Sequence, residues 1–227
     1  AGNTNLTSIS LPASVESIND GAFKGCTNLK EITLPASVKS IGESAFEGCS
    51  SLTKITMGDA VASIGAGAFY GCTALTSLTI PSAVTSIPTN AFTDCTALAT
   101  ITLGNDVTEI GKEAFANCVS LARFTVPASV SVLGEGAFSG CTALAQIELP
   151  SSVTSVPANC FENCSSLTSV DFDADLTAIG KSAFKGCSSL KNITLPSTVS
   201  VIEESVFEEC SALEKINIGN NITAIKS

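Results

Sequence analysis

The chain has 227 residues, of which 44% are hydrophobic, so it can bury a sizeable core. Its net charge of −10 disfavours contact with phosphate backbones and with anionic lipid surfaces. It contains no apolar run of the roughly 18–20 residues that a membrane-spanning helix requires. We therefore expect no nucleic-acid partner and no insertion into a membrane.

Leucine, phenylalanine and cysteine each recur every 23 residues, and no insertion or deletion breaks the register. The leucines run from Leu6 to Leu213, the phenylalanines from Phe23 to Phe207 and the cysteines from Cys26 to Cys210. A fixed period in this range is typical of a solenoid. The sequence thus predicts a single domain over 1–227, with nine 23-residue repeats from Leu6 to Ala212 and a partial tenth over 213–227.

The repeat that begins at Leu29 shows the elements expected in each coil. Residues 29–34 carry apolar side chains at positions 1, 4 and 6, which predicts a short strand that Pro35 ends, because proline lacks an N–H donor. Residues 38–41 predict a second short extended segment, closed by Gly42. Residues 44–49 are too few for a stable helix and predict a single helical or 3₁₀ turn.

About eight positions in every coil are apolar, and a single coil cannot shield them from water. Stacking the coils buries these side chains against the same positions of the coils above and below. Strands at equivalent positions then form one parallel β-sheet on one face, with roughly 4.8 Å between neighbours.

The segment L-x-x-I-x-L resembles the strand signature of leucine-rich repeats, and the segment S-I-G-x-x-A-F-x-G-C resembles the BspA-like class. The resemblance covers residues 6–227 and implies a leucine-rich-repeat solenoid, a right-handed stack of β/α-type coils. The usual asparagine ladder is missing. We expect small polar side chains such as Ser37 to do part of its backbone capping, which Ala60 and Ala83 cannot do.

Nine of the ten cysteines occupy one core position, where a free thiol behaves as a small hydrophobic group. Side chains stacked in parallel are badly placed for disulfides, so we predict buried, reduced thiols. Cys160 forms C-x-x-x-C with Cys164, but no histidine or second pair supports a zinc site. We interpret Cys160 as a core substitution.

The chain contains no histidine, which excludes Ser–His and Cys–His catalytic pairs. No glycine-rich phosphate-binding loop is present, and the glycines fall in the repeat turns. We therefore expect a protein that is not an enzyme and has no cofactor.

Positions 3 and 5 of each strand are predicted to point to solvent on the concave side, and many of them are threonine. The candidates for contact with a partner are Lys54, Thr79, Thr102, Arg123, Thr125 and Gln146. The threonine row is either a flat binding platform, as in ice-binding solenoids, or a result of β-propensity and same-face packing.

BspA-like repeats occur in large surface proteins of bacteria and some parasitic protists. The resemblance therefore implies an extracellular or cell-surface location and a recognition or adhesion module that binds a host or matrix protein. A structural spacer without a specific ligand is the alternative. The only exposed aromatic expected is Tyr70, and Arg123 is the only arginine, so partner binding is predicted to be weak or multivalent.

Four carboxylates are predicted to lie together near two neighbouring strands: Glu148, Asp171, Asp173 and Asp175. They predict either weak Ca²⁺ binding or a solvated acidic patch. Four N-x-S/T sequons, at Asn5, Asn163, Asn192 and Asn221, are also present. Because a terminal coil has one neighbour only, we further expect the chain to be part of a longer array or to associate end to end.

Overall fold

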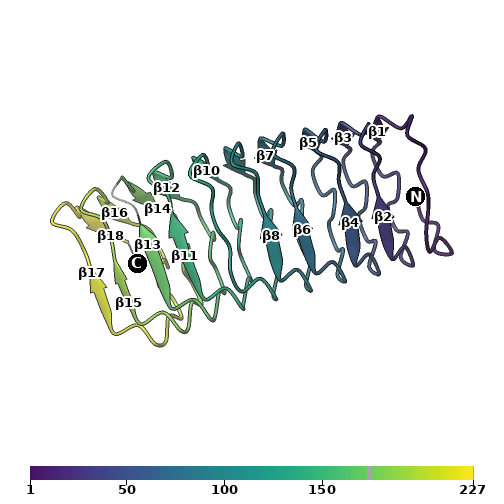
Figure 1. Cartoon of the computed structure of the whole chain (residues 1–227). Helices are drawn as coiled ribbons and strands as arrows, with labels where there is room; N and C mark the ends of the chain where they lie inside the picture. Colours follow the sequence, from purple (N-terminus) through teal and green to yellow (C-terminus); the bar gives the residue numbers. More distant parts are fainter. Residues whose placement is uncertain (173–174, 227) are drawn as a thin grey trace.

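The computed structural model describes residues 1–172 and 175–226, in which the repeats stack as successive coils in one gently bent row (Figure 1). Two strips of parallel strands follow the length of this row. The strands of the first strip lie on one broad face, and the shorter strands of the second strip lie along an adjacent edge (Figure 1).

The first strip consists of strands of three or four residues that begin at the third position of a repeat. They are β2 (Glu31–Thr33), β4 (Lys54–Thr56), β6 (Ser77–Thr79), β8 (Thr100–Thr102), β11 (Gln146–Leu149), β13 (Ser169–Phe172), β15 (Asn192–Thr194) and β17 (Lys215–Asn217). A proline or a glycine follows within a few residues of every one of these strands except β13, which keeps them short.

The second strip consists of two-residue strands at the end of each V-x-S-I segment. They are β1 (Ser17–Ile18), β3 (Ser40–Ile41), β5 (Ser63–Ile64), β7 (Ser86–Ile87), β9 (Glu109–Ile110), β10 (Val132–Leu133), β12 (Ser155–Val156), β14 (Ala178–Ile179), β16 (Val201–Ile202) and β18 (Ala224–Ile225).

Strand pairing in both strips is parallel and joins residues 23 positions apart, but it is not continuous. The first strip is divided into the pairs β2–β4, β6–β8, β11–β13 and β15–β17, and the second into β1–β3–β5, β7–β9–β10 and β12–β14–β16–β18. In the first strip Ile32 of β2 lies opposite Ile55 of β4, and in the second strip Ser17 of β1 lies opposite Ser40 of β3. The register therefore equals the period of the sequence, and the predicted leucine-rich-repeat solenoid is confirmed.

The expected helical or 3₁₀ turn is wrong in detail, because the structure forms non-helical turns there. In the turn 44–49, Ala45, Glu47 and Cys49 donate their N–H groups to carbonyls three residues back, as in β-turns. The alternate residues Ser44, Phe46 and Gly48 donate instead to carbonyls of the next coil, at 2.7–2.9 Å. A helix that continues needs consecutive N–H groups to bond within it, whereas every second N–H group here joins the next coil.

Positive φ angles make this alternation possible. Ser44 has φ 53° and Gly48 has φ 69°, and the equivalent pair recurs from coil to coil. Glycine, asparagine or aspartate often occupies these positions, because these residues tolerate the left-handed region best. No helix in the described ranges is long and apolar enough to cross a bilayer.

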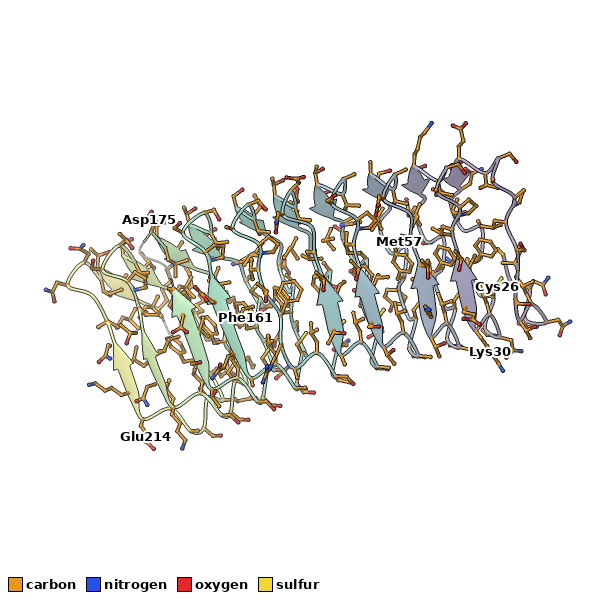
Figure 2. The ribbon with its side chains drawn as sticks, in the orientation of Figure 1. Cys26, Lys30, Met57, Phe161, Asp175 and Glu214 are labelled. Atoms are coloured by element: carbon orange, nitrogen blue, oxygen red, sulfur yellow. The ribbon has the colours of Figure 1, made fainter. Side chains whose placement is uncertain are left out.

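A column of stacked phenylalanine rings fills the centre of the coils. Neighbouring rings from Phe23 to Phe184 lie 5.2–5.5 Å apart and nearly parallel. Phe161 is labelled in this interior position in Figure 2. Phe124 adds a ring that meets Phe115 at 5.1 Å and Phe138 at 4.8 Å, edge to face with the latter.

The periodic cysteines lie beside this column as free, buried thiols. The Cys49 thiol donates to the carbonyl oxygen of Phe23 in the preceding coil, at 3.1 Å, and the same contact recurs up to Cys210. The Phe23 oxygen also accepts the N–H of Cys26, at 3.0 Å. The cysteine side chain thus saturates a buried carbonyl between coils. Cys160 is likewise fully buried, as expected for a core substitution.

Hydroxyl groups replace part of the missing asparagine ladder, as predicted. Ser37 donates to the Val15 carbonyl at 2.6 Å, and Ser129 makes the equivalent bond to Val107 at 2.6 Å. Asn221 donates to the Ser197 carbonyl at 2.8 Å.

Among the described residues, the coil that contains β17 and β18 exposes Ile216, Ile218 and Ile225. End-to-end association through such apolar side chains stays a prediction.

The first testable prediction concerns Phe115, which is fully buried between Phe92 and Phe138, 5.4 and 5.5 Å away. Replacing it with alanine is expected to lower the free energy of unfolding by about 3–5 kcal/mol, because the ring leaves a cavity that the rigid stack cannot close. The control Thr102→Ala, on the exposed face, should change it by less than about 0.5 kcal/mol. Denaturant titration measures the free energy of unfolding of both variants. Equal decreases for the two variants would contradict the assignment of Phe115 to the core and of Thr102 to the surface.

A second prediction concerns the thiols. Burial raises the pKa of the Cys49 and Cys95 thiols to about 12 and that of Cys210 to about 11. An unfolded thiol ionises at pH ~8.5, whereas the buried thiols of the folded chain stay protonated to higher pH. The free energy of unfolding is therefore highest below that pH, and it falls as the pH rises toward the pKa values of the folded thiols. Denaturation midpoints should therefore fall steeply above pH ~8.5. Cys118→Ala should reduce that slope.

In the same protein, a thiol reagent should react little in the native state and find ten thiols after unfolding without reductant. A native protein whose thiols react freely would show that the cysteine column is accessible.

Candidate functional site

The most regular exposed surface is the face of the first strip, which we call the strand face. It consists of the side chains at positions 3 and 5 of each repeat. In β4 the side chains of Lys54 and Thr56 are exposed and Ile55 between them is buried, and β2, β6 and β8 show the same alternation. Successive side chains of a strand point to opposite sides, so the core that fixes Ile55 also fixes the exposed neighbours.

The structure places all six candidate contact residues on the strand face. Lys54 lies in β4, Thr79 in β6, Thr102 in β8 and Gln146 in β11, and all four are exposed. Thr79 lies directly opposite Thr102 in the parallel register. Arg123 and Thr125 are also exposed and belong to the coil between β8 and β11. Their exposure agrees with the sequence pattern, and their role in binding stays a prediction.

The coil of Arg123 has no named strand in the first strip. Its contact with the strip is a parallel bridge between Arg123 and Gln146. In this coil Phe124 takes the place that isoleucine holds in β4 and β8, and its ring contacts the rings of both Phe115 and Phe138.

Shallow hollows lie where the strand face meets the turn that follows each strand. One of 330 Å³ is lined by residues that include Lys54, Thr79 and Pro81. Another of 410 Å³ is lined by Thr125, Glu148 and Pro150, among others. The sequence reasoning missed this proline side of the face, although a proline that recurs directly after the strands was a signal for it.

The cations of the strand face are free of local ion pairs. Within residues 1–172 and 175–226, neither Lys54 nor Arg123 has a carboxylate within 4.0 Å. Elsewhere on the surface, lysines pair across neighbouring coils, as Lys39 does with Glu16 at 3.0 Å. Lys54 and Arg123 can therefore pair with a partner without first breaking an internal contact.

The structure brings together only part of the predicted acidic cluster. Glu148 and Asp171 lie opposite each other in the pairing of β11 with β13, and both are exposed. Asp175 lies in the turn before β14, at the upper edge in Figure 2, and Asp173 lies outside the described residues. In the part of the chain that the structure describes, no group of three or more acidic, histidine or cysteine side chains has a geometry suited to a metal.

Weak Ca²⁺ binding by these carboxylates stays a prediction. If it occurs, calorimetry at millimolar Ca²⁺ should show heat that disappears in Asp171→Asn combined with Asp173→Asn, because carboxylate oxygens are the preferred ligands. No heat for the unaltered chain, or the same heat for the double variant, would contradict it.

Comparison with protein families identifies the repeat. The model of the BspA type leucine-rich repeat region, built of six copies, matches residues 2–122 and 108–227. Comparison with curated proteins finds no match.

Solved bacterial structures share the architecture. A leucine-rich repeat protein from Bacteroides ovatus is 26% identical, with a TM-score of 0.72, over 100% of this chain and 70% of that one. The leucine-rich repeat protein of T. pallidum is 30% identical, with a TM-score of 0.57, over 79% of this chain and 76% of that one. A leucine-rich repeat protein from Eubacterium ventriosum, 22% identical with a TM-score of 0.64 over 93% of this chain and 78% of that one, shows the shared fold alone.

The 23-residue register, the buried phenylalanine–cysteine column and the family match over nearly the whole length lead to one conclusion: the chain belongs to the BspA-type leucine-rich-repeat family.

Proposed function

We propose that this chain is a non-catalytic recognition or adhesion module at a cell surface or outside the cell, and that its strand face binds a protein partner. The observation that carries the proposal is the strand face itself. It presents exposed side chains at fixed spacing, on a backbone held by the core, and Lys54 and Arg123 form no ion pair with the residues that the structure describes.

The available chemistry supports binding over catalysis. The chain has no histidine, so the commonest general base is missing. The thiols, which are the strongest nucleophiles in the chain, are buried, and burial raises the pKa of Cys49 and Cys95 to about 12. A thiol that stays protonated and enclosed does not attack a substrate.

Family membership supports the proposed extracellular location, because BspA-like repeats occur in large surface proteins. A host or matrix protein is the partner class that this membership favours. The strand face offers a single arginine and no exposed aromatic side chain within the described residues, so each contact should be weak. Repetition of the same surface along the coils suits multivalent binding, in which several weak contacts act together.

The proposal is tested by measuring binding of the chain to immobilised extracellular-matrix proteins. Thr102→Glu places a charge in the middle of the strand face and should weaken binding by at least about tenfold, which corresponds to 1.4 kcal/mol. Arg123→Ala should also weaken binding to the matrix protein.

Thr85→Glu is the matched control, since Thr85 is exposed in the segment that leads into the second strip and gains the same charge. Equal weakening by Thr85→Glu and Thr102→Glu would contradict a site on the strand face. Failure of the unaltered chain to bind any matrix protein would favour the alternative function, a structural spacer.

A further inference from the structure

A second surface differs in charge from the strand face. We call it the turn ridge: the stacked turns between the second strip and each periodic cysteine, at 19–25, 42–48, 65–71, 88–94, 111–117, 134–140, 157–163, 180–186 and 203–209. It holds four lysines, Lys24, Lys112, Lys181 and Lys185. It holds eleven carboxylates, Asp20, Glu43, Glu47, Asp94, Glu113, Glu135, Glu162, Glu203, Glu204, Glu208 and Glu209. The ridge therefore carries most of the net charge of −10.

The lysines of the ridge are already engaged. Each pairs with a carboxylate of a neighbouring coil, as Lys24 does with Glu47 at 2.9 Å and Lys185 with Glu208 at 2.7 Å. Over the described residues, Glu43, Glu162 and Glu209 have no such ion partner. The charge left over on the ridge is therefore negative, and it favours a positively charged partner.

One hollow interrupts the ridge, with a volume of 240 Å³. It exists because Ala66 and Gly67 are small, whereas the preceding coil carries Glu43 and Ser44 at the same positions. Glu43 and Glu47 line one side of the hollow, and Asn90 lies on the other.

Tyr70 also lines this hollow and is 38% exposed. It is the one aromatic side chain that the described ranges expose. The carboxylate of Asp94 raises the pKa of Tyr70, so its hydroxyl stays protonated. A ring beside carboxylates attracts a cation to its face, and the carboxylates add charge-assisted hydrogen bonds.

We propose that the hollow over Tyr70 is a docking point for a lysine or arginine side chain of a basic segment of a protein. Glu43, which has no ion partner among the described residues, meets the charged group, and the Tyr70 ring contacts the aliphatic stem or the cation itself. Glu47 lines the hollow but stays paired with Lys24. The unpaired carboxylates along the ridge attract the rest of the segment. This surface is separate from the strand face, so either proposal can fail alone.

The chain provides its own reporter, because Tyr70 is its only tyrosine and it has no tryptophan. A short lysine-rich peptide without aromatic residues should change the tyrosine fluorescence saturably. The affinity should fall as salt is added, because salt screens exposed charges. An acidic peptide of the same length should leave the fluorescence unchanged.

Glu43→Gln should weaken binding of the lysine-rich peptide by about tenfold, the effect of 1.4 kcal/mol. The control Glu162→Gln removes the same charge from a distant coil, also without breaking an ion pair among the described residues, and should change binding by less than about threefold. Thr102→Glu, on the strand face, should leave it unchanged.

Equal weakening by the two glutamine variants would overturn the proposal, because it would show diffuse attraction without a docking point. Calorimetric heat that persists in Tyr70→Ala would also overturn it. Circular dichroism of each variant confirms that the coils are intact.

Discussion

The structure depends on the alternation of main-chain hydrogen bonds in the turn that carries phenylalanine and cysteine. Ala45, Glu47 and Cys49 bond within the turn, while Ser44, Phe46 and Gly48 bond to the next coil. This third line of contacts complements the two strand strips. It also joins coils whose strands do not pair, as Gly67 and Phe69 do by donating to Thr89 and Ala91 where β4 and β6 are unpaired. The stacking distance is thereby fixed, and phenylalanine rings 5.2–5.5 Å apart fill the space that remains.

Because each coil contacts only its neighbours, the scaffold tolerates substitution at any exposed position. The strand face and the turn ridge use this freedom differently. The strand face keeps small polar side chains with a few unpaired cations, whereas the turn ridge concentrates carboxylates and neutralises its own lysines. One solenoid thus presents two long surfaces of different chemistry, and they suit different partners.

Two departures from the regular pattern stand out beneath or on the surface. Phe124 adds a ring to the core beneath the strand face, in the coil where Arg123 forms only a bridge. Ala66 and Gly67 reduce the turn ridge and expose Tyr70 in a hollow. In a repeat protein such departures are the positions where individual recognition can arise, since the regular coils offer the same groups again and again.

The sequence alone predicted the solenoid, its register, the buried column of phenylalanine and cysteine, and the exposure of Lys54, Thr102 and Arg123. These features follow from a strict period, because a residue type that recurs every 23 positions must occupy the same environment in every coil. The non-helical turn could be found only in the tertiary structure, because the N–H group of Phe46 bonds to the next coil and not within its own turn. The separation of Asp175 from Glu148 and the hollow over Tyr70 needed the tertiary structure as well. The position of Asp175 depends on the path of the chain after β13, and the hollow depends on which side chains of adjacent coils are small. Both involve distances between coils, which stacking sets and the order of residues alone does not.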